Sequence, residues 1–349
     1  YLVVKNGSIT VNAKGNGLKS DNADDAAKGY VSVETGTLRI TSSGDAITAR
    51  TDVVVSGGTF TLTSGGGSGR TVTGTVSAKG IKGVVSSVID GGTFTISSAD
   101  DAIHSHGNVT INGGTFTISS GDDGIHADST LCISDGDIAI SKCYEGLESA
   151  NITINNGTIH ITASDDGLNG AGGNDGSGMR GWPGGFTPTG NYLLAINGGR
   201  IVVTAVGDGI DINGSIVMTG GVVIVNGPTA NGNGALDYDG TFKISGGFVV
   251  AAGSSGMAQA PGTGSIQSSL LMNLRSTLAA GTLFTIVNGD GNPILSFAPT
   301  KKYQSIAFSS PDLKNGSTYS VYTGGSSTGT LSDGLYQGGV YTQIGRAHV

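Results

Sequence analysis

Two segments of the sequence combine paired carboxylates with a histidine. "SADDAIHS" occupies residues 98–105, and "SGDDGIHA" occupies residues 120–127, twenty-two residues further on. Carboxylate oxygens are the ligands that hard cations such as Ca²⁺ prefer, whereas histidine can bind a transition metal or transfer a proton. These residue types at this spacing therefore suggest three possible functions, namely cation binding, acid–base catalysis and recognition of a polar ligand.

Acidic residues recur two positions before an aliphatic residue in most copies of a repeat, and Asn16 and Lys79 occupy that position in two other copies. The aliphatic markers are Leu18, Ile47, Ile81, Ile103, Ile125, Leu147, Leu168, Ile210 and Leu236. In a stacked fold the acids would form a row, where carboxylates about 5 Å apart repel by roughly 1 kcal/mol in water and by more at lower dielectric. We expect Ca²⁺ to offset this repulsion, since it accepts roughly six to eight oxygen ligands in irregular geometry. The candidate calcium ligands are Asp100, Asp101, Asp122, Asp123, Glu145, Asp165, Asp166 and Asp208.

Alternatives to calcium remain open at this corner. Aspartate side chains also cap turns by accepting backbone N–H groups. Raised pKa values would remove part of the charge, and Lys79 and Lys82 could neutralise one end of the row. The two histidines, His104 and His126, allow a transition metal, but the hard oxygen ligands around them make Zn²⁺ a weaker interpretation than Ca²⁺.

A second polar row follows each aliphatic marker by one residue. Over the central coils it contains Lys82, His104, His126, Glu148, Asn169 and Asp211. We expect these side chains to face outward and to line a track for a carbohydrate. A glycine-rich insertion adds Arg180 and Trp182, and an exposed indole can stack on the apolar face of a sugar ring. That tryptophan could equally anchor its own loop.

Enzymatic activity stays undecided at this level. A lyase acting on polyuronates needs a Lys or Arg base beside calcium, and the available cations are Lys79, Lys82, Arg180 and Arg200. A glycoside hydrolase needs two carboxylates that face one groove. Too many carboxylates meet that condition, so the pattern selects no catalytic residue and favours binding over catalysis.

A repeat of 22 residues must position both rows. Glycines that close NGG-like turns recur along the chain, and the aliphatic markers usually lie 11 residues from them. Within "NVTINGGTFTISSGDDGIHADS", apolar and polar residues alternate in short runs, which predicts three short strands per coil. Equivalent residues would then stack, as Phe60, Phe94 and Phe116 illustrate. The pattern predicts an all-β, right-handed parallel β-helix with about 22 residues per coil.

The repeat predicts three regions in the chain. Residues 1–265 form the β-helix, and the pattern stops at about Ile266. Residues 266–343 contain short apolar segments separated by "NGDGN" and "KNG", which indicate a C-terminal antiparallel β-meander that caps or extends the helix. The final residues 344–349 resemble a translated adapter, so we expect a non-native tail.

Composition and charge exclude several classes of partner. Gly accounts for 63 of 349 residues and Pro for 7, which suits tight turns between short strands. The net charge of −8 argues against nucleic acid and anionic lipid as partners, and no apolar run approaches the length of a membrane span. The two cysteines, Cys132 and Cys143, are expected to be free thiols.

Three longer motifs carry a resemblance to a known family. "SAKGIKG", "SADDAIHSHGNVTINGGTFTISSGDDGIHAD" and "SDDGLNGAGGNDGSG" resemble the polysaccharide-lyase-like, carbohydrate-binding β-helix proteins of anaerobic bacteria. That resemblance implies a calcium-containing protein, secreted or on the cell surface, which binds plant polysaccharides. It also implies that the "DD" corners hold the calcium ligands, while "CYEGLES" departs from the pattern by placing Glu145 where the pair would be.

The sequence thus predicts an extracellular or cell-surface bacterial protein that binds calcium and a plant cell-wall polysaccharide such as cellulose or a pectic chain. A calcium-dependent polyuronate lyase is the first alternative, and a structural adhesin without glycan affinity is the second.

Overall fold

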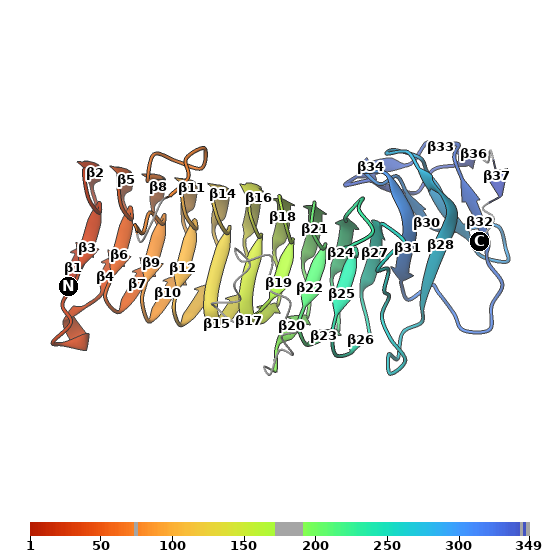
Figure 1. Ribbon diagram of the computed structural model, residues 1–349, viewed down its shortest axis with the longest axis horizontal. Helices are drawn as coiled ribbons and strands as arrows, with labels where there is room; N and C mark the ends of the chain where they lie inside the picture. Colours follow the sequence, from red (N-terminus) through yellow and green to blue (C-terminus); the bar gives the residue numbers. More distant parts are fainter. Residues whose placement is uncertain (73–75, 172–190, 343–344, 347–349) are drawn as a thin grey trace.

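The computed structural model describes residues 1–72, 76–171, 191–342 and 345–346. Within these residues the protein is all-β, and the only helical element is one 3₁₀ turn, η1 (Ala26–Lys28). Figure 1 shows an elongated row of short strands that runs from the N-terminus to a separate group of strands at the other end. No helix of the described chain has the length and apolar character needed to span a membrane.

Three series of parallel strands build the row. The first is β3 (Leu18–Ser20), β6 (Ile47–Ala49), β9 (Ile81–Gly83), β12 (Ile103–Ser105), β19 (Leu168–Gly170), β22 (Ile210–Ile212) and β25 (Leu236–Tyr238). The second is β1 (Leu2–Val4), β4 (Val31–Val33), β7 (Asp52–Val55), β10 (Ser86–Ile89), β13 (Asn108–Ile111), β20 (Leu193–Ile196), β23 (Ser215–Met218) and β26 (Phe242–Ile244). Two longer strands, β15 (Ile125–Ile133) and β17 (Leu147–Ile154), run through both series, which together form one 17-stranded sheet.

The third series forms most of a 12-stranded sheet. It contains β2 (Ser8–Ala13), β5 (Thr37–Ser42), β8 (Thr59–Ser64), β11 (Thr93–Ser98), β14 (Thr115–Ser120), β16 (Asp137–Cys143), β18 (Thr158–Ala163), β21 (Arg200–Ala205), β24 (Val222–Asn226) and β27 (Phe248–Gly253). Each strand pairs in parallel with its counterpart in the next coil. These large parallel sheets are compatible with a parallel β-helix.

Stacked apolar side chains fill the space between the sheets. The predicted aromatic stack is confirmed: Phe60 pairs with Phe94 and Phe94 with Phe116, with ring centroids 4.5 and 4.6 Å apart. All three rings are buried. A second stack on the same strands is aliphatic, and it consists of Leu62, Ile96, Ile118, Ile140 and Ile161. Alternation of inward and outward residues along short strands is sufficient to create both stacks.

Glycine is required where each coil turns into the third series. Gly58, Gly92 and Gly114 have φ values of 119°, 119° and 115°, a region that side-chain-bearing residues rarely adopt. The Gly58 and Gly92 carbonyls accept the N–H groups of Thr93 and Thr115 in the following coil. The repeated turn glycine therefore keeps the hydrogen-bond ladder continuous around the turn.

The C-terminal region is antiparallel, as its sequence predicts. It contains β28 (Ser269–Leu278), β29 (Phe284–Val287), β30 (Pro293–Phe297), β31 (Tyr303–Ser309), β32 (Ser320–Thr323), β33 (Ser326–Ser327), β34 (Thr330–Ser332), β35 (Leu335–Gln337), β36 (Tyr341–Thr342) and β37 (Gly345–Arg346). Strand β31 pairs antiparallel with β27, so it covers the open edge of the parallel stack. The two residues of β37 belong to the expected non-native tail, and they pair with β32.

The appendage also packs against the outer side of the last coils. Outward-facing Val202, Ile224 and Val250 share a buried cluster with Phe284, Phe297 and other appendage residues. Strands β34 and β35 are joined by the dipeptide Asp333-Gly334, in which both residues have positive φ. This hairpin turn brings Asp333 to Arg200, whose Nε and Nη2 lie 2.8 and 2.6 Å from its Oδ2. His160 Nε2 lies 3.1 Å from its Oδ1.

We expect Asp333→Asn to weaken the docking of the appendage by about 1 kcal/mol at pH 7, because asparagine keeps the turn but loses the paired ion contact. Burial opposes ionisation of Asp333, but the contacts with Arg200, His160 and Ser332 together outweigh it and lower the pKa of Asp333. A lowered folded pKa means that this stabilisation is present above the unfolded pKa of about 3.9 and is lost as pH falls through the folded pKa.

Urea unfolding at several pH values tests this expectation. The difference in midpoint between wild type and Asp333→Asn should be present at pH 7 and should shrink below about pH 4. The matched control is Asp290→Asn, since Asp290 is exposed and makes no ion pair within the described chain. A midpoint difference that does not change with pH would contradict the assigned ion pair.

Candidate functional site

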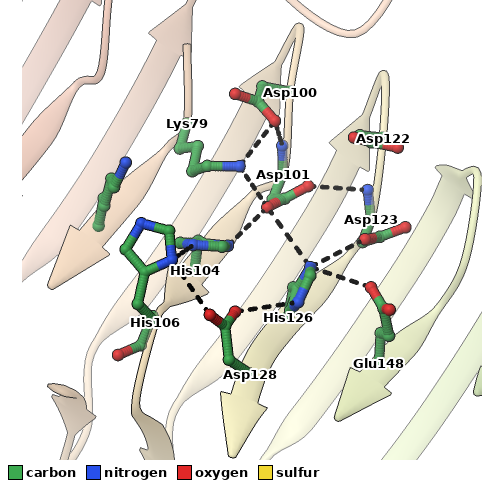
Figure 2. Close-up of polar contacts among 12 residues, drawn as sticks. Lys79, Asp100, Asp101, His104, His106, Asp122, Asp123, His126, Asp128 and Glu148 are labelled. Atoms are coloured by element: carbon green, nitrogen blue, oxygen red, sulfur yellow. Dashed lines mark hydrogen bonds and ion pairs between the residues drawn. The ribbon is translucent and has the colours of Figure 1, made fainter. Parts of the chain in front are cut away.

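The two "DD…IH" segments lie side by side at one corner of adjacent coils (Figure 2). Ile103 and Ile125 point into the core and are fully buried. Alternation then places the next residues, His104 and His126, on the opposite side of the strand. They are register partners in β12 and β15, and their ring centroids are 4.9 Å apart.

A protein cation neutralises the first carboxylate pair. Lys79 Nζ lies 2.7 Å from Asp100 Oδ1 and also contacts Asp101 Oδ2. Burial disfavours the Lys79 ammonium, but Asp101 and Asp100 outweigh this cost and raise its pKa. Burial likewise opposes ionisation of Asp101, yet Lys79 and His104 lower its pKa. Of the two lysines considered from the sequence, Lys79 caps this pair, while Lys82 Nζ lies 3.5 Å from Ser77 Oγ.

The first-row side chains also cap the next coil. Asp101 Oδ1 accepts the backbone N–H of Asp123 at 3.2 Å, and Asp123 Oδ1 accepts that of Glu145 at the same distance. The same contact recurs at Asn16, Asp45, Asp166 and Asp208. Turn capping therefore explains why an oxygen-bearing side chain recurs at this corner, and it leaves the second carboxylate oxygen for other partners.

The two histidines contact the second carboxylate oxygen of Asp101 and of Asp123. His104 Nδ1 lies 2.8 Å from Asp101 Oδ2, and His126 Nδ1 lies 3.2 Å from Asp123 Oδ2 and 2.9 Å from Glu148 Oε2. Burial lowers the pKa of His104 to about 4, and the neighbouring Lys79 charge adds to the effect. Burial also disfavours charge on His126, but Asp123 and Glu148 overcome it and raise its pKa to about 11.

The outward second row expected from the sequence is wrong for three residues. His104, Glu148 and Asn169 are each 4% exposed, because they turn toward the first row instead of solvent. Asn169, for example, donates through Nδ2 to Glu145 Oε2 at 2.7 Å. The remaining described members, Lys82, His126 and Asp211, are half-buried. Both predicted rows thus belong to one polar cluster, in which Asp101 contacts Lys79 and Asp123 contacts His126.

A second acidic group lies further along the corner. Carboxylate oxygens of Asp166, Asp208 and Asp211 all lie within 4.8 Å of one another. Burial, followed by the charges of Asp166 and Asp208, raises the pKa of Asp211 to about 8. Asp100, Asp101 and Asp122 form another group of carboxylates, and the Lys79 ammonium contacts two of them. The ligand atoms that Asp166, Asp208 and Asp211 offer are carboxylate oxygens, which suit Ca²⁺.

Two residues that the sequence analysis did not select contact the histidines. His106 Nδ1 lies 3.4 Å from His104 Nε2 and 3.2 Å from Asp128 Oδ2. His126 Nε2 lies 3.3 Å from Asp128 Oδ1. Their signal was present in the sequence, because the 22-residue offset that aligns His104 with His126 also aligns His106 with Asp128.

The other predicted residues are placed as follows. Asp122 is exposed and Asp165 is half-buried, each beside its paired aspartate. Arg180 and Trp182 lie outside the described residues. Cys132 and Cys143 are both free, as expected, and burial raises the pKa of the Cys143 thiol.

The N-terminal coils are similar to a known family. Residues 1–124 match the family model described as "Carbohydrate-binding domain-containing protein". No curated protein and no solved structure matches the chain. The matched residues include β12 with His104 and end one residue before β15 begins.

Proposed function

We propose that this protein binds a polysaccharide, and the match of residues 1–124 to a carbohydrate-binding family carries the proposal. The long parallel sheets support it physically. Successive coils present the same backbone surface at intervals of about 4.8 Å, so a repeating polymer could make equivalent contacts along the row. A plant cell-wall glycan, such as cellulose or a pectic chain, is the proposed ligand. The polysaccharide-lyase-like part of the resemblance belongs to this proposal as well.

The proposal includes the finer features of the fold and location. We take the parallel stack to be a right-handed β-helix with about 22 residues per coil, consistent with pairs such as Phe94 with Phe116. We place the protein outside a bacterial cell or on its surface, where polymeric glycans are accessible.

Calcium is proposed at Asp166, Asp208 and Asp211. Burial and the charges of Asp166 and Asp208 raise the pKa of Asp211, and a divalent cation between the three carboxyl groups would favour the ionised form of Asp211. At this position Ca²⁺ could join adjacent coils and accept hydroxyl or carboxylate oxygens from an acidic sugar. Asp166 and Asp208 are among the calcium ligands predicted from the sequence, and Asp211 joins them from the predicted carbohydrate-binding row.

Affinity electrophoresis in gels containing cellulose derivatives or polygalacturonate tests both parts. We expect retardation of the wild type in CaCl₂, and weaker retardation in EGTA or in Asp211→Asn by at least about 10-fold in affinity. The matched control is Asp137→Asn, since Asp137 is an exposed carboxylate on β16, away from the cluster.

Three results would count against the proposal or a part of it. Absence of retardation on every glycan would overturn carbohydrate binding. Equal retardation in EGTA and CaCl₂ would overturn the calcium part alone. An increase in ultraviolet absorbance in the polygalacturonate sample, which unsaturated sugar products cause, would show that the lyase alternative is correct.

A further inference from the structure

Two adjacent coils bring metal-binding side chains together. The segments "HSH" at 104–106 and "HAD" at 126–128 are aligned by the pairing of β12 with β15, in which His104 lies opposite His126. The two-residue spacing then brings His106 beside Asp128. Figure 2 shows His106 and His126 on either side of the Asp128 carboxylate.

Three donor atoms from the two coils lie close enough to share one ion. His104 Nε2 lies 3.4 Å from His106 Nδ1, and His106 Nδ1 lies 3.2 Å from Asp128 Oδ2. Ligand atoms of His104, His106 and Asp128 all lie within 4.8 Å of one another. The ligand atoms of a tetrahedral site with metal–ligand bonds of about 2.0–2.1 Å lie about 3.3 Å apart, so an ion could bind with modest movement of the side chains.

The outer partners of this group are those of a metal site. His104 directs Nδ1 to the buried Asp101 carboxylate at 2.8 Å, which orients the ring and leaves Nε2 facing His106. Metal-binding histidines typically use the second ring nitrogen in this way. His126 Nδ1 is held by Asp123 and Glu148, and its Nε2 lies 3.3 Å from Asp128 Oδ1, so this histidine orients the Asp128 carboxylate.

We propose that His104, His106 and Asp128 bind one divalent transition-metal ion, with Zn²⁺ as the best match. Two imidazoles and one carboxylate form a nitrogen-rich set that favours Zn²⁺ over Ca²⁺. The ion would fasten one coil to the next, because both histidines lie in one coil and Asp128 lies in the following one. His106 is 51% exposed at its side chain, so the ion can approach from that side.

The test uses the full chain after EDTA treatment and dialysis. We expect one equivalent of Zn²⁺ to bind in competition with a chromophoric chelator, with no displacement by millimolar Ca²⁺. Co²⁺ should give the visible absorption typical of four-coordinate geometry. Zn²⁺ should also raise the melting temperature of the wild type.

Variants separate this site from other zinc-binding groups. His106→Ala should weaken binding by more than the roughly 10–100-fold that loss of an outer partner costs, and it should abolish the thermal shift. The exposed position of His106 means that the metal-free variant should melt as the metal-free wild type does. The matched control is His160→Ala, because His160 contacts Asp333 far from this cluster and its loss should leave zinc affinity unchanged.

The proposal is overturned if the wild type binds less than one equivalent of Zn²⁺, if His106→Ala binds as tightly as the wild type, or if Ca²⁺ competes equally. None of these outcomes bears on carbohydrate binding, because the glycan assay depends on a different cluster and a different ion.

Discussion

Phe94→Ala is expected to lower the free energy of unfolding by about 3–5 kcal/mol, which is the usual cost of deleting a buried aromatic side chain. The Phe94 ring lies between Phe60 and Phe116 at centroid distances of 4.5 and 4.6 Å, and its interplanar angles to them are 7° and 3°. Removing it would leave a cavity between two coils and would break the stack in both directions.

Chemical denaturation of Phe94→Ala, followed by circular dichroism, gives the measurement. The control is Thr95→Ala, whose side chain is exposed on the same strand and whose loss should change stability by less than about 0.5 kcal/mol. Each repeat contacts mainly its neighbours, so the destabilised coils could also unfold separately and broaden the transition. An unchanged midpoint in Phe94→Ala would show that these rings do not carry the coil interface.

Lys79→Met is expected to destabilise the protein by about 3–5 kcal/mol at neutral pH, because it leaves buried carboxylates without their cation. Asp101 is 1% exposed, and the Lys79 side chain is 12% exposed. Methionine retains most of the volume of the lysine stem, so the measured loss would report the missing charge rather than a cavity.

Lys82→Met is the matched control for the missing charge. This lysine lies three residues further on and forms no ion pair within the described part of the chain. Its substitution should change the unfolding midpoint little, whereas Lys79→Met should lower it strongly. The double variant Lys79→Met plus Asp101→Asn removes one negative charge together with the positive charge, so it should recover part of the lost stability. Equal midpoints for the two single variants would contradict the assigned role of Lys79.

The corner as a whole stabilises its carboxylates in different ways along its length. Lys79 neutralises Asp100 and Asp101 at the first position. The histidines contact Asp101, Asp123 and Glu148 in the next coils, and the proposed Zn²⁺ would add charge there. The proposed calcium ligands further along the corner are Asp166, Asp208 and Asp211. The carboxylate charge at this repeated turn-capping position is thus balanced in different ways in different coils.

Most of the architecture could be predicted from the sequence by itself. The offset of 22 residues aligns Phe94 with Phe116 and Ile96 with Ile118, and these residues are register partners in the structure. A one-residue shift would turn every apolar side chain outward, so burial specifies the register strongly. The loss of the repeat after Ile266 likewise indicated the antiparallel appendage. What could not be predicted was that Val202, Ile224 and Val250 would be covered by it.

The candidate site shows where sequence information ended. Periodicity determined that His104 and His126 share a row, and that acidic residues precede them. Only the tertiary structure decided that these histidines turn toward Asp101 and Asp123, that Lys79 reaches across from the preceding coil, and that His106 meets Asp128. The physical reason is that backbone pairing fixes which residues are neighbours, whereas the rotamers of long polar side chains depend on burial and on the charges of every adjacent coil.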